Sequence, residues 1–192
     1  MSMSFINEIE QSVKILNQGK SLLYPTDTVW GLGCDPFNIQ AVKKIYKIKN
    51  RKLFKPMIIL VENINRLHDL ITFIPNKLMK LLEQNINKPM TIIYDNPRKI
   101  ISNCIFIKHD KTLAIRITMD TFCYNLIKNL DKPLISTSAN LSGDPTPKSF
   151  SEIHPSILNK IDYAVNFRRQ EKSMYNESSI IKLVSNQITI LR

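Results

Sequence analysis

Apolar residues recur with helical spacing at the start of the chain, where Phe5, Ile9 and Leu16 would share one helix face. Ser4 is a candidate N-cap for this helix, and Gly19 is a candidate end. The apolar run over 21–24 then predicts a strand. Pro25 ends that run with a turn, so residues 26–28 are expected on a loop after the strand.

The rest of the chain alternates between helical and strand-like patterns. Helices are predicted over 38–48, 63–71, 75–86, 120–130 and part of 149–160, and strands over 57–61, 90–94, 104–107, 113–117 and 134–136. Two further strand-like runs, 179–184 and 187–191, flank Asn186 and predict an antiparallel edge pair. This alternation predicts an α/β fold with a mixed parallel and antiparallel sheet, in a single domain over residues 1–192.

Three polar segments interrupt these apolar runs, at 24–33, 49–51 and 136–143. The first and third follow predicted strands, and ligands of open α/β sheets bind where strands end. We therefore expect the three segments to form one site.

Each polar segment has an alternative interpretation. Lys49 and Arg51 could project together to hold a phosphate, or they could be one more solvated basic pair. The serine, threonine and asparagine of 136–140 could be site residues, or they could only satisfy backbone groups where a strand ends.

The composition excludes several classes of site. Gly-x-Gly-x-x-Gly and Gly-Lys-Ser/Thr motifs are absent, and no histidine is linked by sequence to a serine or cysteine as in a hydrolase triad. The odd number of cysteines and their wide spacing argue against a disulfide framework or a zinc site. The N-terminus lacks a signal-peptide pattern and no apolar run is long enough to span a membrane, so a cytoplasmic location is expected.

The formal net charge of +11 would attract a polyanion. The chain is rich in lysine, asparagine and isoleucine throughout, so this charge could equally reflect coding bias. The densest basic cluster, over 43–55, could be a solvated helix face or an anion site.

Taken in order, four segments resemble the YrdC family of bacterial threonylcarbamoyl-AMP synthases. They are the stretch 24–36, the Lys49-x-Arg51 pair, the run 113–116 and the stretch 132–143. The resemblance runs nearly from end to end and implies a twisted, open mixed sheet around a cationic cavity. It also implies synthesis of threonylcarbamoyl-AMP and pyrophosphate from L-threonine, bicarbonate and ATP, a nucleotidyl transfer that serves the threonylcarbamoyl modification of adenosine in tRNA. ATP would bring Mg²⁺ without a protein metal site, a threonylcarbamoyl transferase complex would use the product, and tRNA or RNA binding is possible.

The resemblance also implies roles for particular residues. The catalytic group would comprise Lys49, Arg51, Ser138 and Asn140. Nucleotide contacts would fall on Arg51, Lys55, Asn140, Lys148, Thr112 and Arg192, and threonine contacts on Thr28, Arg116, Ser138 and Ser178. Arg116 could pair with the amino-acid carboxylate, and the alternative for Arg116 is a buried ion pair.

Several positions depart from the family pattern. Glycines expected between Asn166 and Glu177 are missing, and Arg168 and Arg169 stand in that loop instead. Arg192 is the last residue, so its own carboxylate would partly cancel its charge.

One other function is open to a chain with these features, and a second is disfavoured by its length. A non-catalytic module that binds double-stranded RNA would need only the surface charge, whereas an enzyme would also need Ser138 and Asn140. A carbamoyl-transfer domain of hydrogenase maturation would need accompanying zinc-finger and acylphosphatase segments, which 192 residues do not accommodate.

Overall fold

The computed structural model describes residues 2–53, 55, 57–84, 88–95, 97–98, 112–172, 178–184 and 187–191. The predicted strand over 104–107, the Asn186 turn and Arg192 lie outside the described residues. The helices are α1 (Met3–Asn17), α2 (Ile39–Ile48), α3 (Ile64–Leu70), α4 (Asn76–Gln84), α6 (Thr121–Leu130) and α7 (Pro155–Leu158), with a 3₁₀ turn at Phe150–Glu152. The strands are β1 (Leu22–Tyr24), β2 (Gly31–Gly33), β3 (Ile58–Val61), β4 (Met90–Tyr94), β5 (Leu113–Ile117), β6 (Leu134–Ser138), β7 (Tyr163–Ala164), β8 (Ser179–Val184) and β9 (Gln187–Ile190).

Side-chain caps fix where several helices begin. Asn38 and Asp120 each accept a hydrogen bond from the backbone N–H three residues later, as the sequence predicted for helices starting there. The first helix differs from the prediction, because Ser2 rather than Ser4 caps it. Gly19 ends that segment with a φ of 71°, a left-handed conformation that glycine adopts without strain.

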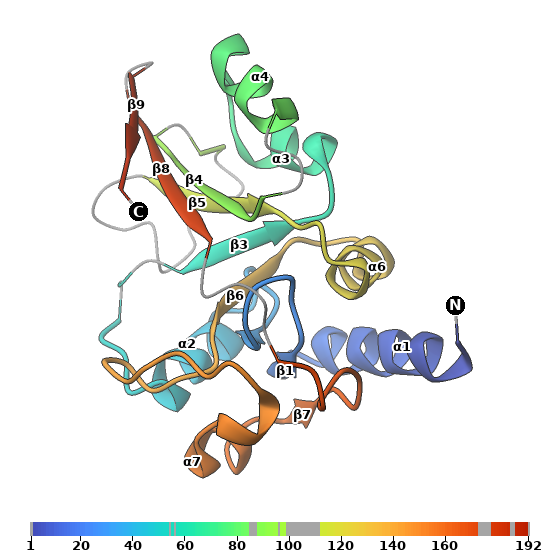
Figure 1. Ribbon diagram of the computed structural model, residues 1–192. Coiled ribbons are helices and arrows are strands. Elements are labelled where there is room, and N and C mark those ends of the chain that lie inside the picture. The colour runs from blue at the N-terminus through green and yellow to red at the C-terminus, as the bar shows by residue number, and fades with distance from the viewer. Residues whose placement is uncertain are drawn as a thin grey trace.

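The strands of the described residues form one mixed sheet in the order β7-β1-β2-β6-β3-β5-β4-β8-β9. The pairs β1–β7, β3–β5 and β4–β8 are parallel and the other neighbours are antiparallel. The predicted antiparallel edge pair at the C-terminal end is confirmed as β8 and β9 (Figure 1).

Two strands were not predicted as such. Gly31–Gly33 were expected within a polar segment, but these residues form β2 between β1 and β6. β7 is a short parallel partner of β1. The strand predicted over 134–136 extends to Ser138, because Thr137 and Ser138 pair with Leu32 and Gly31 of β2. β2 and β7 are too short to show a hydrophobic period of their own, so only their pairing with neighbouring strands reveals them.

Helices cover the two faces of this sheet. Ile59 and Val61 of β3 belong to a core with α2, α3 and α7, whereas Leu60 belongs to a second core with α1 and α6. α1 and α6 lie side by side on their face of the sheet (Figure 1). The alternation of β3 between two cores is the period-two pattern of a central strand buried on both faces.

Candidate functional site

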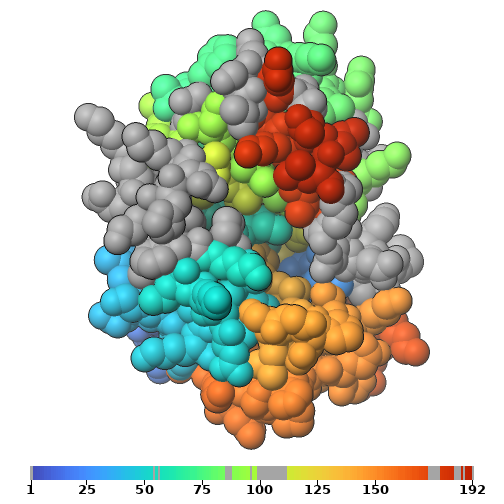
Figure 2. Space-filling view, turned by 90° about the vertical axis from the view of Figure 1, so that its left-hand side faces the viewer, coloured from blue at the N-terminus to red at the C-terminus, as the bar shows by residue number. Residues whose placement is uncertain are grey.

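A cavity of about 310 Å³ lies where the strands of the sheet converge with the loop after β1. Alternate positions of the central strands line it, and these positions are Ile58, Thr91, Ile93, Ala114, Arg116 and Ser136. Figure 2 shows the hollow on the molecular surface between the C-terminal strands and the segments around residues 50 and 140. The polar segments that were expected to meet therefore do meet here.

Internal hydrogen bonds shape the loop over 25–30 that carries Thr28. The Oγ1 atom of Thr26 donates to the carbonyl oxygen of Val29 at 2.7 Å and accepts from the N–H of Thr28 at 3.0 Å. The hydroxyls of Thr26 and Thr28 lie 3.1 Å apart. A threonine that bonds to the backbone two and three residues on is a common turn device, and here it directs Thr28 into the cavity.

Arg116 lies at the base of the cavity and is only 4% exposed. Its guanidinium donates to the Oγ1 atom of Thr28 at 3.1 Å and forms an ion pair with Asp27 at 3.0 Å. Its Nε atom is buried without a hydrogen-bond partner in the described part of the chain. The buried ion pair that was the alternative for Arg116 is therefore present, and the same side chain also lines the cavity.

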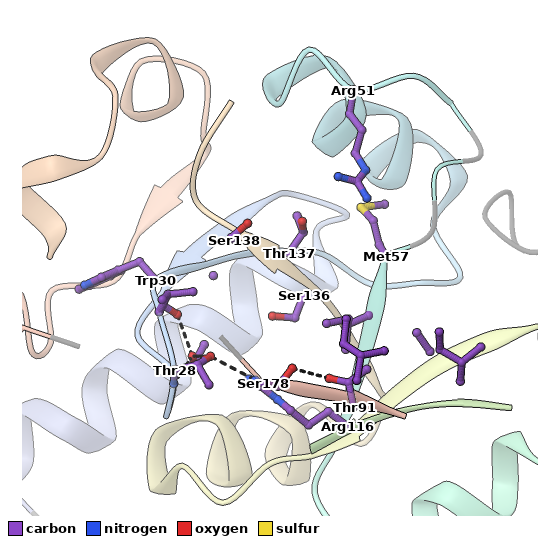
Figure 3. Close-up of a pocket in the computed structure, with 17 residues that line it drawn as sticks. Thr28, Trp30, Arg51, Met57, Thr91, Arg116, Ser136, Thr137, Ser138 and Ser178 are labelled. Atoms are coloured by element: carbon purple, nitrogen blue, oxygen red, sulfur yellow. Dashed lines mark hydrogen bonds between the residues drawn. The ribbon is translucent and has the colours of Figure 1, made fainter. Parts of the chain in front are cut away.

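Two hydroxyl groups complete this end of the cavity. Ser178, just before β8, and Thr91 of β4 both line it, and their hydroxyl oxygens lie 2.7 Å apart. Figure 3 shows them beside Arg116 and Thr28, with Arg51 at the opposite end. This end therefore offers one cation and several hydroxyls within a buried wall.

Ser138 and Asn140 follow β6 and are linked to each other. The Oγ atom of Ser138 donates to the Oδ1 atom of Asn140 at 2.6 Å, and the Nδ2 atom of Asn140 donates to the carbonyl of Asp144 at 2.7 Å. Ser138 lines the cavity, whereas Asn140 organises the loop behind it.

Lys49 lies beneath this loop and is 1% exposed. Its ammonium donates to the carbonyl oxygens of Ser138 and Asn140 and to the Oδ1 atom of Asn140. Burial, together with the nearby charge of Arg51, lowers the pKa of Lys49 to about 7. Lys49 therefore supports the loop of Ser138 and Asn140 from behind.

Arg51 lines the cavity, and burial lowers its pKa. The Lys-x-Arg spacing predicted that Lys49 and Arg51 could project to the same side. They diverge, because Lys49 is the C-cap of α2 and Asn50 follows it with a left-handed φ of 49°. The chain turns sharply there, so one cation is directed into the protein and the other toward the cavity.

Three other predicted nucleotide contacts, Lys55, Thr112 and Lys148, are not part of the cavity wall. Lys55 and Lys148 are exposed, and Thr112 is half-buried just before β5. Arg192 is not among the described residues. The structure thus brings Thr28, Arg51, Arg116, Ser138 and Ser178 together, with Lys49 and Asn140 directly behind them.

Several residues that shape the cavity were not predicted from the sequence. Thr91 is one of them, and a threonine at an inward position of the apolar strand Met90–Tyr94 was a signal that could have identified it. Asp27 is another, because its pairing with Arg116 joins segments far apart in the chain.

The cavity wall carries Arg51 and Arg116, so it suits an anionic ligand. In the part of the chain that the structure describes, no group of three His, Cys, Asp or Glu side chains is placed to hold a metal ion. Within that same part, none of the helices combines the length and apolar character needed to cross a membrane.

The Sua5/YciO/YrdC family model, which carries the description "Telomere recombination", matches residues 14–192 of this chain. The chain belongs to this family. Two similar members of the Sua5/YciO/YrdC family are named threonylcarbamoyl-AMP synthase. The protein from Pseudoalteromonas translucida is 34% identical over 85% of this chain and 88% of its own length, and that from Wigglesworthia glossinidia brevipalpis is 35% identical over 83% and 82%.

A solved structure of the Sua5/YciO/YrdC family agrees with the fold. The crystal structure of P. abyssi Sua5 complexed with L-threonine superposes with a TM-score of 0.84 at 27% identity. The match covers 96% of this chain and 53% of the P. abyssi chain, so this chain spans about half of that protein. The predicted open mixed α/β sheet is confirmed.

Proposed function

We propose that this chain is a threonylcarbamoyl-AMP synthase that forms threonylcarbamoyl-AMP and pyrophosphate from L-threonine, bicarbonate and ATP. Three findings support the proposal: the names of the full-length relatives, the L-threonine bound to P. abyssi Sua5, and a cationic cavity lined by hydroxyl groups. The enzyme would then be a nucleotidyltransferase, because the adenylyl group of ATP moves to the carbamate.

The observation that carries the proposal is the buried guanidinium of Arg116. A buried donor without a partner costs free energy, and a ligand carboxylate would satisfy the Nε atom of Arg116. L-threonine bound in this way would have its amine and its side-chain hydroxyl close to Thr28, Thr91 and Ser178. We assign the threonine site to this end of the cavity.

We assign the triphosphate to the end of the cavity that carries Arg51. A planar guanidinium donates two hydrogen bonds to phosphate oxygens, and partial burial strengthens that interaction. Ser138 lies between the two ends (Figure 3), and it would donate to the carbamate or to the α-phosphate by exchanging its present hydrogen bond to the Oδ1 atom of Asn140. Four residues remain predicted nucleotide contacts, namely Lys55, Thr112, Lys148 and Arg192. At least the two exposed lysines would have to move for their side chains to reach the cavity.

The chemistry needs little covalent participation by the protein. Bicarbonate loses hydroxide to give carbon dioxide, and the threonine amine adds to the carbon dioxide while its proton combines with the hydroxide to form water. A carbamate oxygen then attacks the α-phosphorus of ATP while pyrophosphate leaves with its bridging electron pair. The protein positions the reactants and stabilises the negative charge that develops on the phosphoryl oxygens. Mg²⁺ would enter as the ATP complex, because phosphate oxygens and water are its preferred ligands.

In the cell, the product would serve a threonylcarbamoyl transferase complex that modifies adenosine in tRNA. A cytoplasmic location and direct tRNA binding belong to the same proposal, and the net charge of +11 would favour the latter.

The proposal is tested by pyrophosphate release from purified protein with Mg-ATP and bicarbonate, with and without L-threonine. We expect release that depends on threonine and is lost in Ser138→Ala. Ser151→Ala is the matched control, because Ser151 is exposed and lies outside the cavity. A wild-type protein that releases no pyrophosphate with threonine but binds RNA in a salt-sensitive manner would instead support the RNA-binding module.

A further inference from the structure

Two consecutive arginines follow β7 and reach toward opposite ends of the loop over 25–30 that carries Thr28. Arg168 and Arg169 belong to the segment that follows Tyr163–Ala164. The space between this segment and the Thr28 loop is small, a gap of about 20 Å³ lined by Arg168, Glu171 and Lys172 on one side and by residues from 25 to 30 on the other. The two loops therefore lie against each other.

The first connection runs from Arg168 to Pro25. The guanidinium of Arg168 forms an ion pair with the buried carboxylate of Asp120. The other carboxylate oxygen of Asp120 caps α6 by accepting from the N–H of Cys123 at 2.9 Å, and the Cys123 thiol donates to the carbonyl of Pro25 at 3.4 Å. Arg168 thus stabilises the helix terminus that holds the beginning of the loop.

The second connection runs from Arg169 to Trp30. The Nε and NH2 atoms of Arg169 donate to the carbonyls of Val165 and Ala164 at 2.9 and 2.6 Å. Its guanidinium lies 4.4 Å from the centroid of the Phe150 ring, which packs edge-on against Trp30 at 5.0 Å between ring centroids. Such cation–π and edge-to-face contacts are favourable and directional.

The indole of Trp30 serves this contact rather than the cavity interior. In Figure 3 its ring extends away from the other labelled residues, although Trp30 belongs to the cavity lining. The carbonyl of Trp30 accepts from the N–H of Ala139 at 2.9 Å, which ties the same residue to the end of β6. Trp30 is therefore the anchor at the end of the loop.

The backbone of Arg168 has a φ of 59°, in the left-handed region where a side chain is unfavourable and glycine is not. Glycine would adopt this conformation without that cost, but it would lack the guanidinium. The side chain of Arg168 forms ion pairs with Asp120 and with the exposed Glu171, and only Asp120 connects it to α6.

We propose that Arg168 and Arg169 are positioning residues that hold the two ends of the Thr28 loop and thereby keep Thr28 and Arg116 in place for the amino-acid substrate. The consequence for threonine rests on the proposed function, whereas the consequence for the loop does not. Neither arginine touches the substrate.

The first test is hydrogen exchange in the ligand-free protein. Arg168→Gly removes the side chain and relieves the backbone strain, and Arg169→Met removes the guanidinium but keeps an unbranched stem. We expect amide exchange over residues 26–30 to become about tenfold faster in both variants, while α1 is unchanged. Arg66→Met is the matched control, because it removes an arginine bonded to Glu62 and Asp131 outside the cavity. Unchanged exchange over 26–30 would overturn the proposal, whatever the enzyme catalyses.

The second test is steady-state kinetics. We expect the KM for L-threonine to rise about tenfold in Arg168→Gly, with a smaller change for ATP, even if its melting temperature matches or exceeds that of the wild type. If Arg168 had only a structural role, the variant would lose thermal stability and its KM values for L-threonine and ATP would rise together. That result would refute the assignment. A wild-type protein without threonine-dependent activity would refute the proposed function and leave the exchange result intact.

Discussion

Lys49→Met is the substitution with the most specific expected signature, because it removes a buried ammonium group and little volume. Lys49 is 1% exposed, and its Nζ atom donates to oxygen atoms of Ser138 and Asn140. Methionine retains the unbranched stem and fills much of the same space. The variant therefore isolates the charge and its hydrogen bonds from the packing of the stem.

The magnitude follows from the pKa of Lys49, which burial and then the charge of Arg51 lower from 10.5 to about 7. That difference corresponds to a cost of about 5 kcal/mol for keeping the ammonium charged in the folded protein. The cost is complete below pH 7 and has disappeared above pH 10.5. Between these values the unfolded chain binds the additional proton, so the folded state gains stability as pH rises.

Between pH 7 and pH 9, Lys49 should therefore add about 2 kcal/mol to the free energy of unfolding of the wild type, and nothing to that of Lys49→Met. The destabilisation caused by the substitution should grow by the same amount over that interval. The carbonyl oxygens around the ammonium stabilise its charged form, so this figure is an upper limit.

The assay is denaturant unfolding at both pH values, followed by the fluorescence of Trp30, the single tryptophan of the chain. Lys47→Met is the control, because Lys47 is exposed on the same helix. All other titrating groups cancel in the comparison of wild type and variant. Equal destabilisation at pH 7 and pH 9 would show that Lys49 titrates normally and would refute the reasoning.

Three further predictions concern the cavity and the core. Arg116→Met should raise the KM or Kd for L-threonine by roughly 30- to 100-fold through loss of charged hydrogen bonds, measured by calorimetry and kinetics; unchanged threonine affinity would remove Arg116 from the site. Gly33→Ala should lower the free energy of unfolding by about 3 kcal/mol, because a Cβ atom would lie 2.8 Å from the ring of Tyr24 and overlap the backbone of β6. Thermal unfolding measures this loss, and a melting temperature equal to that of the wild type would contradict the prediction. Burial raises the thiol pKa of Cys34 and Cys123, so a thiol reagent should modify these two cysteines only after the protein unfolds. Peptide mass spectrometry would detect the modification, and rapid labelling of the folded protein would disprove their burial.

Local sequence determined most of the secondary structure. The strands Met90–Tyr94 and Leu113–Ile117 have the bounds that their apolar runs predicted, and the helices predicted over 38–48, 63–71 and 120–130 are capped at those starting residues by Asn38, Asn63 and Asp120. The order of polar segments along the chain also sufficed to identify the family, which the family model confirms. Periodicity and capping act within a few residues, so they can be detected without knowledge of the partners.

Tertiary structure decided which polar residues face the cavity. Lys49 and Arg51 are two residues apart, yet the left-handed turn at Asn50 sends only Arg51 to the cavity wall. Because β2 pairs with β6, residues that were expected in polar loops are strand residues, and this pairing sets the positions of Gly31 and Ser138. Asp27 and Arg116 form an ion pair only because the fold brings the loop after β1 and strand β5 to the same cavity. Such contacts depend on segments far apart in sequence, and no local pattern records which of them will meet.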